Sequence, residues 1–310
     1  MLPDAANPER GRFVRDQASA LARLQDVHVT LHEFPPGAAQ LARSAVELRR
    51  RFAHPPGAAH ERWDIVHAHF GLTAWPSLTV RARAHALTVH GTDVRHPRTR
   101  IVTAAALPLI DLLAAVSAPL AAELPTRRAR VRARVLPCGV DLERFHAVPR
   151  PQARTALGLA AQQPYLLFPA DPARASKRHD LAAALADAVG VPLLSLGGVD
   201  PEEVPLHVNA ANAVLIPSER EGFGLAALEA LACDVPVLAT PVGIHQQALA
   251  GVAGTLCAPF DLELWKESVT PHLRSPDPRV EGRQSAERFS ATRMAELVRD
   301  AWEEALRPSG

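Results

Sequence analysis

The chain has 310 residues, of which 47% are hydrophobic and 22% charged, and its net charge is +1. This length suits two domains of roughly 150 residues each, and the composition is that of a globular protein with a sizeable core. No apolar run approaches the ~20 residues needed to span a bilayer. Three separate cysteines without metal-ligand spacing favour a reduced compartment, with neither disulfide nor zinc. No secretion signal is recognisable, so a cytoplasmic protein is expected.

Charge is distributed unevenly along the chain. Residues 1–150 hold 21 arginines and 13 acidic residues, net +8, whereas the remainder holds 13 basic and 20 acidic residues, net −7. This supports a domain boundary near residue 150 and a basic surface on the first half. The arginines are not interleaved with aromatic residues, which argues against a nucleic-acid partner. We expect peripheral contact with an anionic membrane surface instead, at the inner face of the membrane.

In chain order, short apolar runs alternate with helical patterns, which is typical of parallel sheets wound with helices. The predicted strands of the first half are 26–31, 65–69, 86–90, 112–117 and 134–137. Those of the second half are 165–169, 192–196, 213–217, 236–240 and 254–257, and the pattern is helical from 279 to 307. The predicted fold class is therefore α/β, with two Rossmann-like doubly wound domains facing a cleft. They span 1–145 and 146–290, and the helix 291–307 packs back on the first domain.

The chain begins with a turn-rich loop and a helix, MLPDAANPERGRFVRDQASALARL, with no strand before them. A doubly wound domain normally begins with a strand that delivers the chain to such a loop. The first strand of the N-terminal domain is therefore missing from the pattern. Of two explanations, a true start upstream of Met1 is favoured over a genuinely truncated protein.

The segment PSEREGFGLAALEALACDVPVLATPVG places Glu221 and Glu229 on either side of seven residues. Gly222 and Gly224 let the backbone approach a ligand, and the helix that follows offers unpaired N–H groups and a positive dipole end. Such a loop is an anion site, and carboxylates accept hydrogen bonds from paired hydroxyls, as on ribose or a hexose. From these residues alone, the alternative is that Glu221 is a helix-dipole partner and Glu229 a solvated helix residue.

The same segment, with HVNAANAVLIPS before it, resembles the donor-site signature of the GT-B glycosyltransferases, specifically the retaining family 4, also described as group 1. The resemblance implies that Glu229 binds the ribose of a nucleotide-diphosphate sugar. It also implies that Glu221 and the loop residues after it hold the transferred sugar: Gly222, Phe223, Gly224 and Leu225.

The segment FPADPARASKRHDLA resembles the place where that family sets an arginine and a lysine on the donor diphosphate. Lys177 matches the lysine, and it is one of only two lysines in the chain. A compact ammonium suits a diphosphate whose charge grows as the bond breaks. Pro172 stands where the arginine is expected, which leaves Arg174 or Arg178 as its substitute. The alternative is a solvated basic loop.

Histidines end two predicted strands of the first half. In ALTVHGTDV, His90 matches the active-site histidine of the family, which implies that it orients the transferred sugar and the acceptor. Asp93, in the same loop, is assigned to the acceptor or phosphate loop. In HAHFG, His67 and His69 share one face of a strand, and both are interpreted as cleft-lining residues that contact the acceptor. Core packing is the alternative, and no further metal ligands can be placed. NPERGRF resembles the first glycine loop of the family, so Gly11 is expected near the diphosphate or acceptor.

Together these features predict a retaining, metal-independent glycosyltransferase with His90, Glu221 and Lys177 as catalytic residues. No Asp-x-Asp pair is available, so neither metal nor cofactor is expected beyond the donor substrate. The acceptor is a glycan, a lipid-linked saccharide or a metabolite, with cell-surface polysaccharide biosynthesis as the favoured context. One alternative is a nucleotide-sugar epimerase or hydrolase on the same fold. The other is a non-catalytic nucleotide-sugar-binding paralogue, favoured by the missing strand and the shifted arginine.

Overall fold

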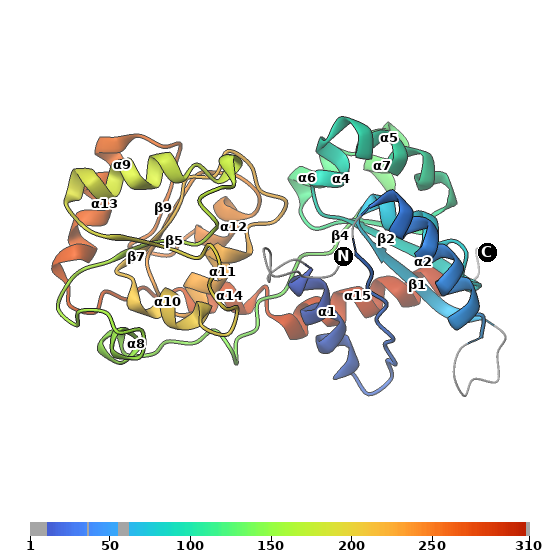
Figure 1. The fold of residues 1–310 in the computed structure, drawn as a ribbon, viewed down its shortest axis with the longest axis horizontal. Coiled ribbons are helices and arrows are strands. Elements are labelled where there is room, and N and C mark those ends of the chain that lie inside the picture. Colours follow the sequence, from blue (N-terminus) through green and yellow to red (C-terminus); the bar gives the residue numbers. More distant parts are fainter. Residues whose placement is uncertain (1–10, 36, 55–61, 308–310) are drawn as a thin grey trace. The chain divides into compact units, whose positions relative to one another are not determined.

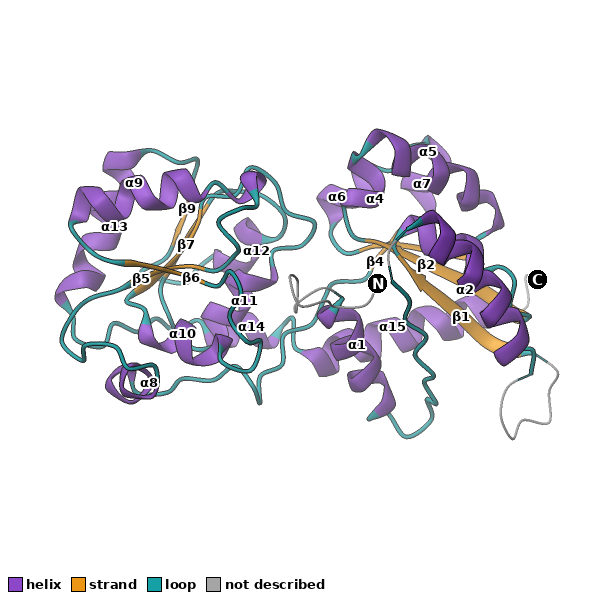
Figure 2. Ribbon diagram, in the orientation of Figure 1, coloured by secondary structure: helices purple, strands orange, loops and turns teal. Residues whose placement is uncertain are grey.

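The computed structural model describes residues 11–35, 37–54 and 62–307, and these divide into two units (Figure 1). The described residues of unit 1 lie within 11–138 and 292–307, and those of unit 2 are 139–291. Each unit holds one parallel sheet with helices packed against it (Figure 2). The prediction of a two-domain α/β fold is confirmed. Within the described ranges, no helix is long and apolar enough to cross a bilayer.

The sheet of unit 1 has the strand order β1-β2-β3-β4, so neighbours in the chain are neighbours in the sheet. Its ladder runs from Trp63 beside Ala82 to His69 beside Thr88 in the first pair of strands. The strands are β1 (Trp63–His69), β2 (Ala82–Val89), β3 (Leu112–Ala115) and β4 (Arg134–Val135). The helices are α1 (Arg12–Ala22), α2 (Ala38–Arg51), η1 (Gly71–Thr73), α3 (Ala74–Ser77), α4 (Thr92–Arg95), α5 (Pro97–Ala106), η2 (Leu107–Leu109), α6 (Ala118–Ala122), α7 (Arg127–Arg132) and α15 (Ala291–Leu306).

The strand predicted at 26–31 is wrong, because this segment has no regular secondary structure. A strand needs a neighbour about 4.8 Å away to pair with. The nearby edge of β1 is not such a neighbour, because two cavities lie between it and residues 26–31. Their volumes are ≈ 180 and ≈ 300 Å³, and each is lined by residues of both segments, including Thr30, Leu31 and Ile65. Beyond Val27, whose N–H donates to Leu24, residues 28–34 make no backbone hydrogen bond to any other described segment.

In unit 2 the strand order is β6-β5-β7-β8-β9, with β5 paired to β6 on one side and to β7 on the other. The strands are β5 (Leu166–Phe168), β6 (Leu193–Ser195), β7 (Ala213–Ile216), β8 (Val237–Ala239) and β9 (Leu256–Cys257). The helices are α8 (Arg150–Ala156), η3 (Ala175–Lys177), α9 (His179–Val189), α10 (Val204–Ala210), α11 (Leu225–Ala232), α12 (His245–Leu249), α13 (Leu262–Arg274) and α14 (Arg283–Glu287).

Between β5 and β7 the sheet has a switch point: β6 is added on one side of β5, and β7 and the strands after it are added on the other side. In open parallel sheets, ligands bind outside the carboxyl ends of the strands at such a switch point. The loop after β5 contains Lys177, and the loop after β7 contains Glu221. The topology therefore brings the two predicted donor-binding loops to one edge of the sheet. Beneath them lies an apolar core that includes Leu166, Phe168, Leu185, Leu215, Leu238 and Trp265.

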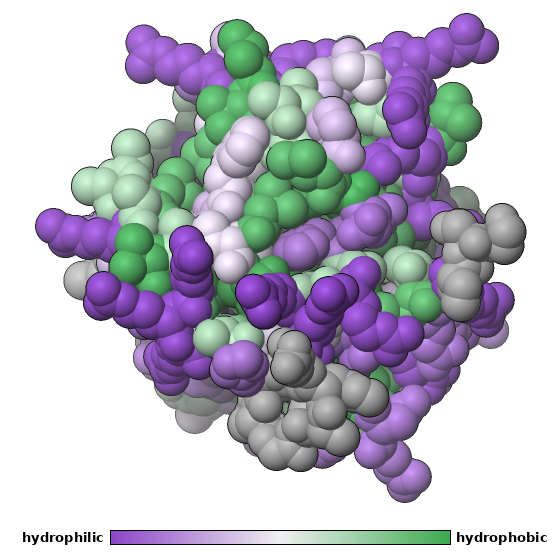
Figure 3. Space-filling model, turned by 90° about the vertical axis from the view of Figure 1, so that its right-hand side faces the viewer, coloured by the Kyte–Doolittle hydropathy of each residue, from purple (hydrophilic) through white to green (hydrophobic). Residues whose placement is uncertain are grey.

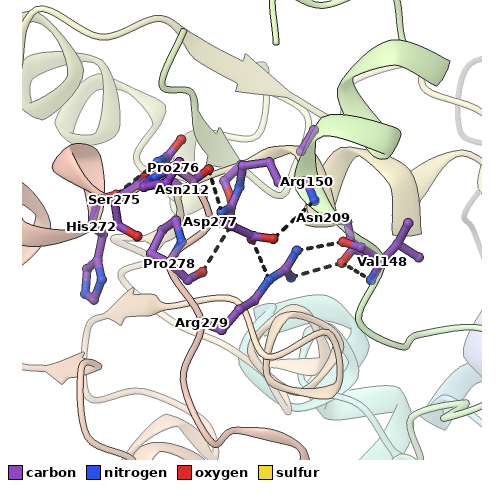
Figure 4. Close-up of polar contacts among 12 residues, drawn as sticks. Val148, Arg150, Asn209, Asn212, His272, Ser275, Pro276, Asp277, Pro278 and Arg279 are labelled. Atoms are coloured by element: carbon purple, nitrogen blue, oxygen red, sulfur yellow. Dashed lines mark hydrogen bonds and ion pairs between the residues drawn. The ribbon is translucent and has the colours of Figure 1, made fainter. Parts of the chain in front are cut away.

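Unit 2 also contains a buried polar cluster around Arg150 (Figure 4). The fully buried Arg150 pairs with Asp277 at 2.6 Å and donates to the carbonyls of Ala211 and Pro278. Arg279 reaches the same Asp277 carboxylate at 2.8 Å. Burial lowers the pKa of Arg150 to about 9, but its partners satisfy the guanidinium. The cluster ties α8 to the segment between α13 and α14.

The polypeptide crosses between the units twice, because α15 belongs to unit 1. There Trp302 Nε1 donates to His67 Nδ1 at 3.0 Å, and Glu304 pairs with Arg134. The helical pattern predicted from 279 to 307 is two helices, α14 and α15, with a break between them. Close to both crossings, the amide of Val140 donates to the carbonyl of Phe289 at 2.8 Å.

Figure 3 shows a face of unit 1 on which hydrophilic side chains surround smaller hydrophobic areas. Among the described residues, the most exposed large apolar side chains of unit 1 are Val131, at 80%, and Ile101, at 72%. Val131 lies on α7, a helix that also holds four arginines.

Candidate functional site

The loop after β7 turns into α11 at Gly224, whose φ is +108°. A side chain there would clash, since a Cβ atom would lie 2.6 Å from Nε2 of His245. Gly243 is equally confined, because a Cβ atom added to it would lie 2.1 Å from the carbonyl oxygen of Phe223. The amide of Ile244 donates to that carbonyl at 2.8 Å. The two glycines thus let the turn after β8 pack directly against the loop before α11.

Lys177 and Glu221 meet at the switch point of unit 2. Nζ of Lys177 lies 2.6 and 2.7 Å from the two carboxylate oxygens of Glu221, and Ser218 Oγ donates to the same carboxylate at 2.8 Å. The side chains are 17% and 10% exposed, respectively. Burial would raise the pKa of Glu221, but the charge and hydrogen bonds of Lys177 lower it below its usual value. Glu221 is therefore ionised.

Glu229 lies one turn into α11. Of the eight residues of this helix, only Leu225, Ala226 and Glu229 are not fully buried. Positions i, i+1 and i+4 share a face of a helix, so these three form one partly open side that begins at the glycine loop. The unpaired N–H groups of the first helical turn lie at the same end. The arrangement offers an anion site next to a carboxylate that can accept hydroxyl groups.

The two candidate arginines differ in their surroundings. Arg174 is exposed at the start of η3. Arg178 has a φ of +58° and forms ion pairs with Asp180 at 2.7 Å and Glu219 at 3.3 Å. The structure therefore brings Lys177 to Glu221 but brings neither arginine to it.

Sequence reasoning missed His245, the first residue of α12. Its Nδ1–H donates to the carbonyl of Thr240 at 2.8 Å, which places the lone pair of the neutral ring on Nε2. Nε2 is buried and has no hydrogen-bond partner among the residues that the structure describes. Burial lowers the pKa of His245, while the charge of Glu221 raises it. The sequence signal that could have identified His245 is its position after the carboxyl end of β8, the strand that neighbours β7.

In unit 1, three histidines gather at the carboxyl ends of β1 and β2. His69 Nδ1 lies 3.0 Å from His90 Nε2, and the rings of His67 and His69 stack at 4.7 Å. His67 Nε2 lies 2.8 Å from Thr88 Oγ1, and the amide nitrogen of Gln17 lies 3.5 Å from His69 Nε2. Two of the predicted site residues, His69 and His90, are thus in direct contact.

One arrangement of the ring protons satisfies these contacts. With Gln17 donating to Nε2 of His69, the Nδ1–H of His69 donates to Nε2 of His90, and the proton of His90 is on Nδ1. Burial lowers the pKa of His69 to about 4, and burial with the neighbouring histidines holds the pKa of His90 well below its ordinary value. At neutral pH His90 is therefore a neutral donor, its ring held between Phe13 and Phe70 at 4.6 and 4.7 Å.

Asp93 and Gly11 shape the surroundings of this histidine cluster. The carboxylate of the buried Asp93 accepts the backbone N–H groups of His90, Gly91 and Gly71 at 2.8 to 3.2 Å, which fixes the turn after β2. Gly11 precedes α1 with a φ of +75° and lines the same cavity as His69. Across residues 11–35, 37–54 and 62–307, no group of three or more His, Cys, Asp or Glu side chains is arranged to hold a metal ion.

Two family models match the chain. "Glycosyltransferase Family 4" matches residues 8–144, and "Glycosyl transferases group 1" matches residues 177–289. A curated relative from Actinosynnema mirum, a D-inositol 3-phosphate glycosyltransferase, is 30% identical over 74% of this chain and 67% of its own length. The chain belongs to the group 1 glycosyltransferases. The relative of the same name from Mycobacterium marinum is 29% identical over 74% of this chain, which spans 58% of that relative.

The GT-B fold of this group 1 glycosyltransferase is also found in Anabaena HepE, solved in complex with UDP and glucose. The two share 16% identity, with a TM-score of 0.69 over 98% of both chains. The group 1 match begins at Lys177 and includes Glu221, Glu229 and His245, whereas the family 4 match includes His69 and His90. Both clusters of candidate residues thus lie in the matched segments.

Proposed function

We propose that this chain is a metal-independent, retaining glycosyltransferase that moves a sugar from a nucleotide-diphosphate sugar to a hydroxyl group. The observation that carries the proposal is the switch point of unit 2, where Lys177 meets Glu221 beside a glycine loop and Glu229 lies one turn into α11. A cation and a helix N-terminus suit a diphosphate, and two carboxylates suit the hydroxyls of sugar and ribose. The UDP and glucose bound by HepE support this choice of donor.

In the proposed reaction, the bond from the sugar C1 to the diphosphate oxygen breaks and a bond from C1 to the acceptor oxygen forms on the same face. The proton of the acceptor hydroxyl passes to the departing diphosphate. Lys177 and the N–H groups at the start of α11 stabilise the negative charge that grows on the diphosphate. Glu229 holds the ribose, Glu221 the transferred sugar, and His90 donates Nδ1–H to a sugar hydroxyl.

The acceptor class proposed is a glycan, a lipid-linked saccharide or a metabolite. The relatives named D-inositol 3-phosphate glycosyltransferase support a small phosphorylated polyol within the last class. Peripheral contact with an anionic membrane is also proposed, supported by the exposed Val131 among the arginines of α7. Co-sedimentation with vesicles of neutral or anionic lipid tests this contact, and equal pelleting with both would contradict it.

The donor site is tested by calorimetry with UDP and UDP-glucose, followed by a panel of other nucleotide-sugars. Glu229→Ala is expected to weaken binding about 10- to 150-fold, because a hydrogen bond to a charged group contributes about 1.5–3 kcal/mol. Glu267→Ala, on the exposed face of α13, is the matched control and should bind like the unaltered chain. Unchanged affinity in Glu229→Ala would contradict the site. The anomeric configuration of the product, read by NMR, tests retention.

A further inference from the structure

The outward side of α5 is exposed and largely apolar. Positions i, i+3, i+4 and i+7 share a face of a helix, and this spacing joins four exposed residues, Arg98, Ile101, Val102 and Ala105. Leu109, in η2 directly after the helix, is exposed as well. Ile101 is 72% exposed and Leu109 is 53% exposed. We call these five residues the α5 face.

Trp75 and α7 border the α5 face. The indole N–H of Trp75, a residue that is 41% exposed, donates to the carbonyl of Val102 at 3.2 Å. Arg132 of α7 donates to the carbonyl of Leu107 in η2 at 2.5 Å, and its neighbour Val131 is 80% exposed (Figure 1). Of the ten large apolar side chains exposed in the described part of the chain, six belong to α3, α5, η2, α7 and β4. Such a concentration indicates an interaction surface.

Arginines surround these apolar side chains. Residues 92–135 hold eight arginines against three acidic residues, net +5. Four of the arginines are on α7, which has no acidic residue: Arg127, Arg128, Arg130 and Arg132. Of the three acidic residues, Asp93 is buried, Glu123 pairs with Arg95 at 2.6 Å, and Asp111 accepts the amide of His85 at 2.8 Å. The surface thus combines exposed aliphatic groups with an excess of positive charge.

The inner side of α5 is fixed to the core of unit 1. Thr103 and Ala106 are fully buried, and Thr103 Oγ1 donates to the carbonyl of Asp93 at 3.1 Å. A Cβ atom added to Gly71 would lie 1.8 Å from the same hydroxyl oxygen, so the helix packs directly against the turn after β1. Rotating α5 to bury its outer side would break this contact. The α5 face is therefore held outward by the packing beneath it.

We propose that the α5 face docks on an anionic lipid bilayer, with Ile101, Leu109 and Val131 entering the boundary between headgroups and acyl chains. The arginines of α7 contact the lipid phosphates, because an arginine stem can lie along apolar groups while its guanidinium stays among the headgroups. Trp75 suits the same depth, since indole rings concentrate at the membrane interface. The inference rests on the membrane contact of the proposed function and names the surface that makes it.

The mixture of groups favours a bilayer over other anionic partners. A nucleic acid would satisfy the arginines but would bury little of the aliphatic area, because its outer surface is a phosphate backbone. The core of a protein interface is depleted in charged residues, whereas here arginines and aliphatic side chains alternate along α7. A bilayer receives both kinds of group at adjacent depths.

The first experiment measures binding to vesicles of phosphatidylcholine, alone or mixed with phosphatidylserine. The double change Ile101→Ser and Leu109→Ser should weaken binding to the mixed vesicles at least about tenfold, because apolar area no longer leaves water in the complex. Leu262→Ser with Leu264→Ser, which alters two exposed leucines of α13, is the matched control and should bind like the unaltered chain. Equal binding by the two double variants would overturn the proposal.

The second experiment separates this surface from the net charge of the chain. Arg127→Gln with Arg128→Gln should weaken binding to the mixed vesicles about 30-fold, since each arginine near an anionic membrane contributes about fivefold. Arg49→Gln with Arg50→Gln removes two exposed arginines of α2 in the same unit and should have a much smaller effect. If both pairs weaken binding equally, the membrane responds to net charge alone and the proposal is wrong.

The third experiment tests entry into the bilayer through tryptophan fluorescence. Lipids brominated on their acyl chains should quench the bound chain, with the quenching lost in Trp75→Phe and kept in Trp302→Phe. A bound chain without quenching would refute insertion. Single-stranded RNA that binds as tightly as the mixed vesicles, with equal affinity for the Ile101→Ser and Leu109→Ser double variant, would assign the surface to nucleic acid instead.

Calorimetry with UDP distinguishes this inference from the donor site. None of the substituted residues belongs to that site, so UDP affinity should be the same in every variant. Failure of the unaltered chain to bind either kind of vesicle, with UDP binding intact, would refute the membrane contact and leave the donor site standing. Failure to bind any nucleotide would refute the donor site, and the vesicle experiments would still decide the docking surface.

Discussion

Replacing Gly224 by alanine tests the packing of the donor-binding loop against His245. The residue has a φ of +108°, and the new Cβ would lie 2.6 and 2.8 Å from Nε2 and Cδ2 of the imidazole. A left-handed conformation costs a non-glycine residue about 1–2 kcal/mol. Overpacking of a tight interior costs about 1–3 kcal/mol more. Gly224→Ala should therefore destabilise unit 2 by about 2–5 kcal/mol.

Gly158 provides the control, because its φ is +67° and no heavy atom lies within 4 Å of its Cβ position. Gly158→Ala should show the conformational cost alone, about 1–2 kcal/mol. Unfolding of unit 2 can be followed through the denaturant dependence of hydrogen exchange in β7 and β8, which report this unit separately.

A double-mutant cycle then isolates the overlap. His245→Ala removes the ring that the new methyl group meets, so the double variant should recover about 1–3 kcal/mol relative to the sum of the single changes. If Gly224→Ala costs no more than Gly158→Ala, or if the two changes are additive within about 0.5 kcal/mol, the close packing of loop and imidazole is refuted.

Three further outcomes are expected. Arg150→Met should destabilise unit 2 by about 3–5 kcal/mol in the same exchange experiment, because it leaves the carbonyls of Ala211 and Pro278 without their donor and removes one of the two arginines that pair with Asp277. The exposed pair of Lys266 and Glu263 should contribute under about 1 kcal/mol when Lys266→Met removes it. Unit 1 should lose stability as pH falls from 6.5 to about 4, because His67, His69 and His90 bind a proton less readily in the folded chain than in the unfolded chain. His69→Gln should remove the part of this loss that belongs to His69, which is on the order of 3 kcal/mol. Transfer from nucleotide-sugar, measured as product formed, should persist in excess EDTA, because Lys177 and the start of α11 provide the positive charge.

The parallel sheets could be predicted because buried strands of such sheets read as short apolar runs. Nine of the ten predicted segments overlap a strand of the structure, and a helix follows the glycine loop as expected. The strand prediction for residues 26–31 was wrong because an apolar pattern indicates burial, whereas a strand also requires a backbone partner at the correct spacing. The break between α14 and α15 was missed because the two helices share a continuous helical periodicity.

For the candidate site, sequence could identify Lys177 and Glu221 but not their mutual ion pair. That contact depends on β5 and β7 being neighbours, which is a property of strand order and not of either motif. His245 was overlooked because its significance comes from a missing hydrogen-bond partner, which only coordinates reveal. The tautomer of His90 likewise follows from Gln17, which lies 52 residues before His69 in the chain.

The placement of α15 in unit 1 bears on the order in which the protein is made. Residues 11–138 leave the ribosome before unit 2, yet His67 receives the indole N–H of Trp302 only after unit 2 has been synthesised. The described residues of unit 2 form one uninterrupted stretch, and all its strands precede α15 in the chain. Domains often fold in order from the N-terminus during translation. Here we expect the reverse, with unit 2 reaching its protease-resistant state on the nascent chain before unit 1 does.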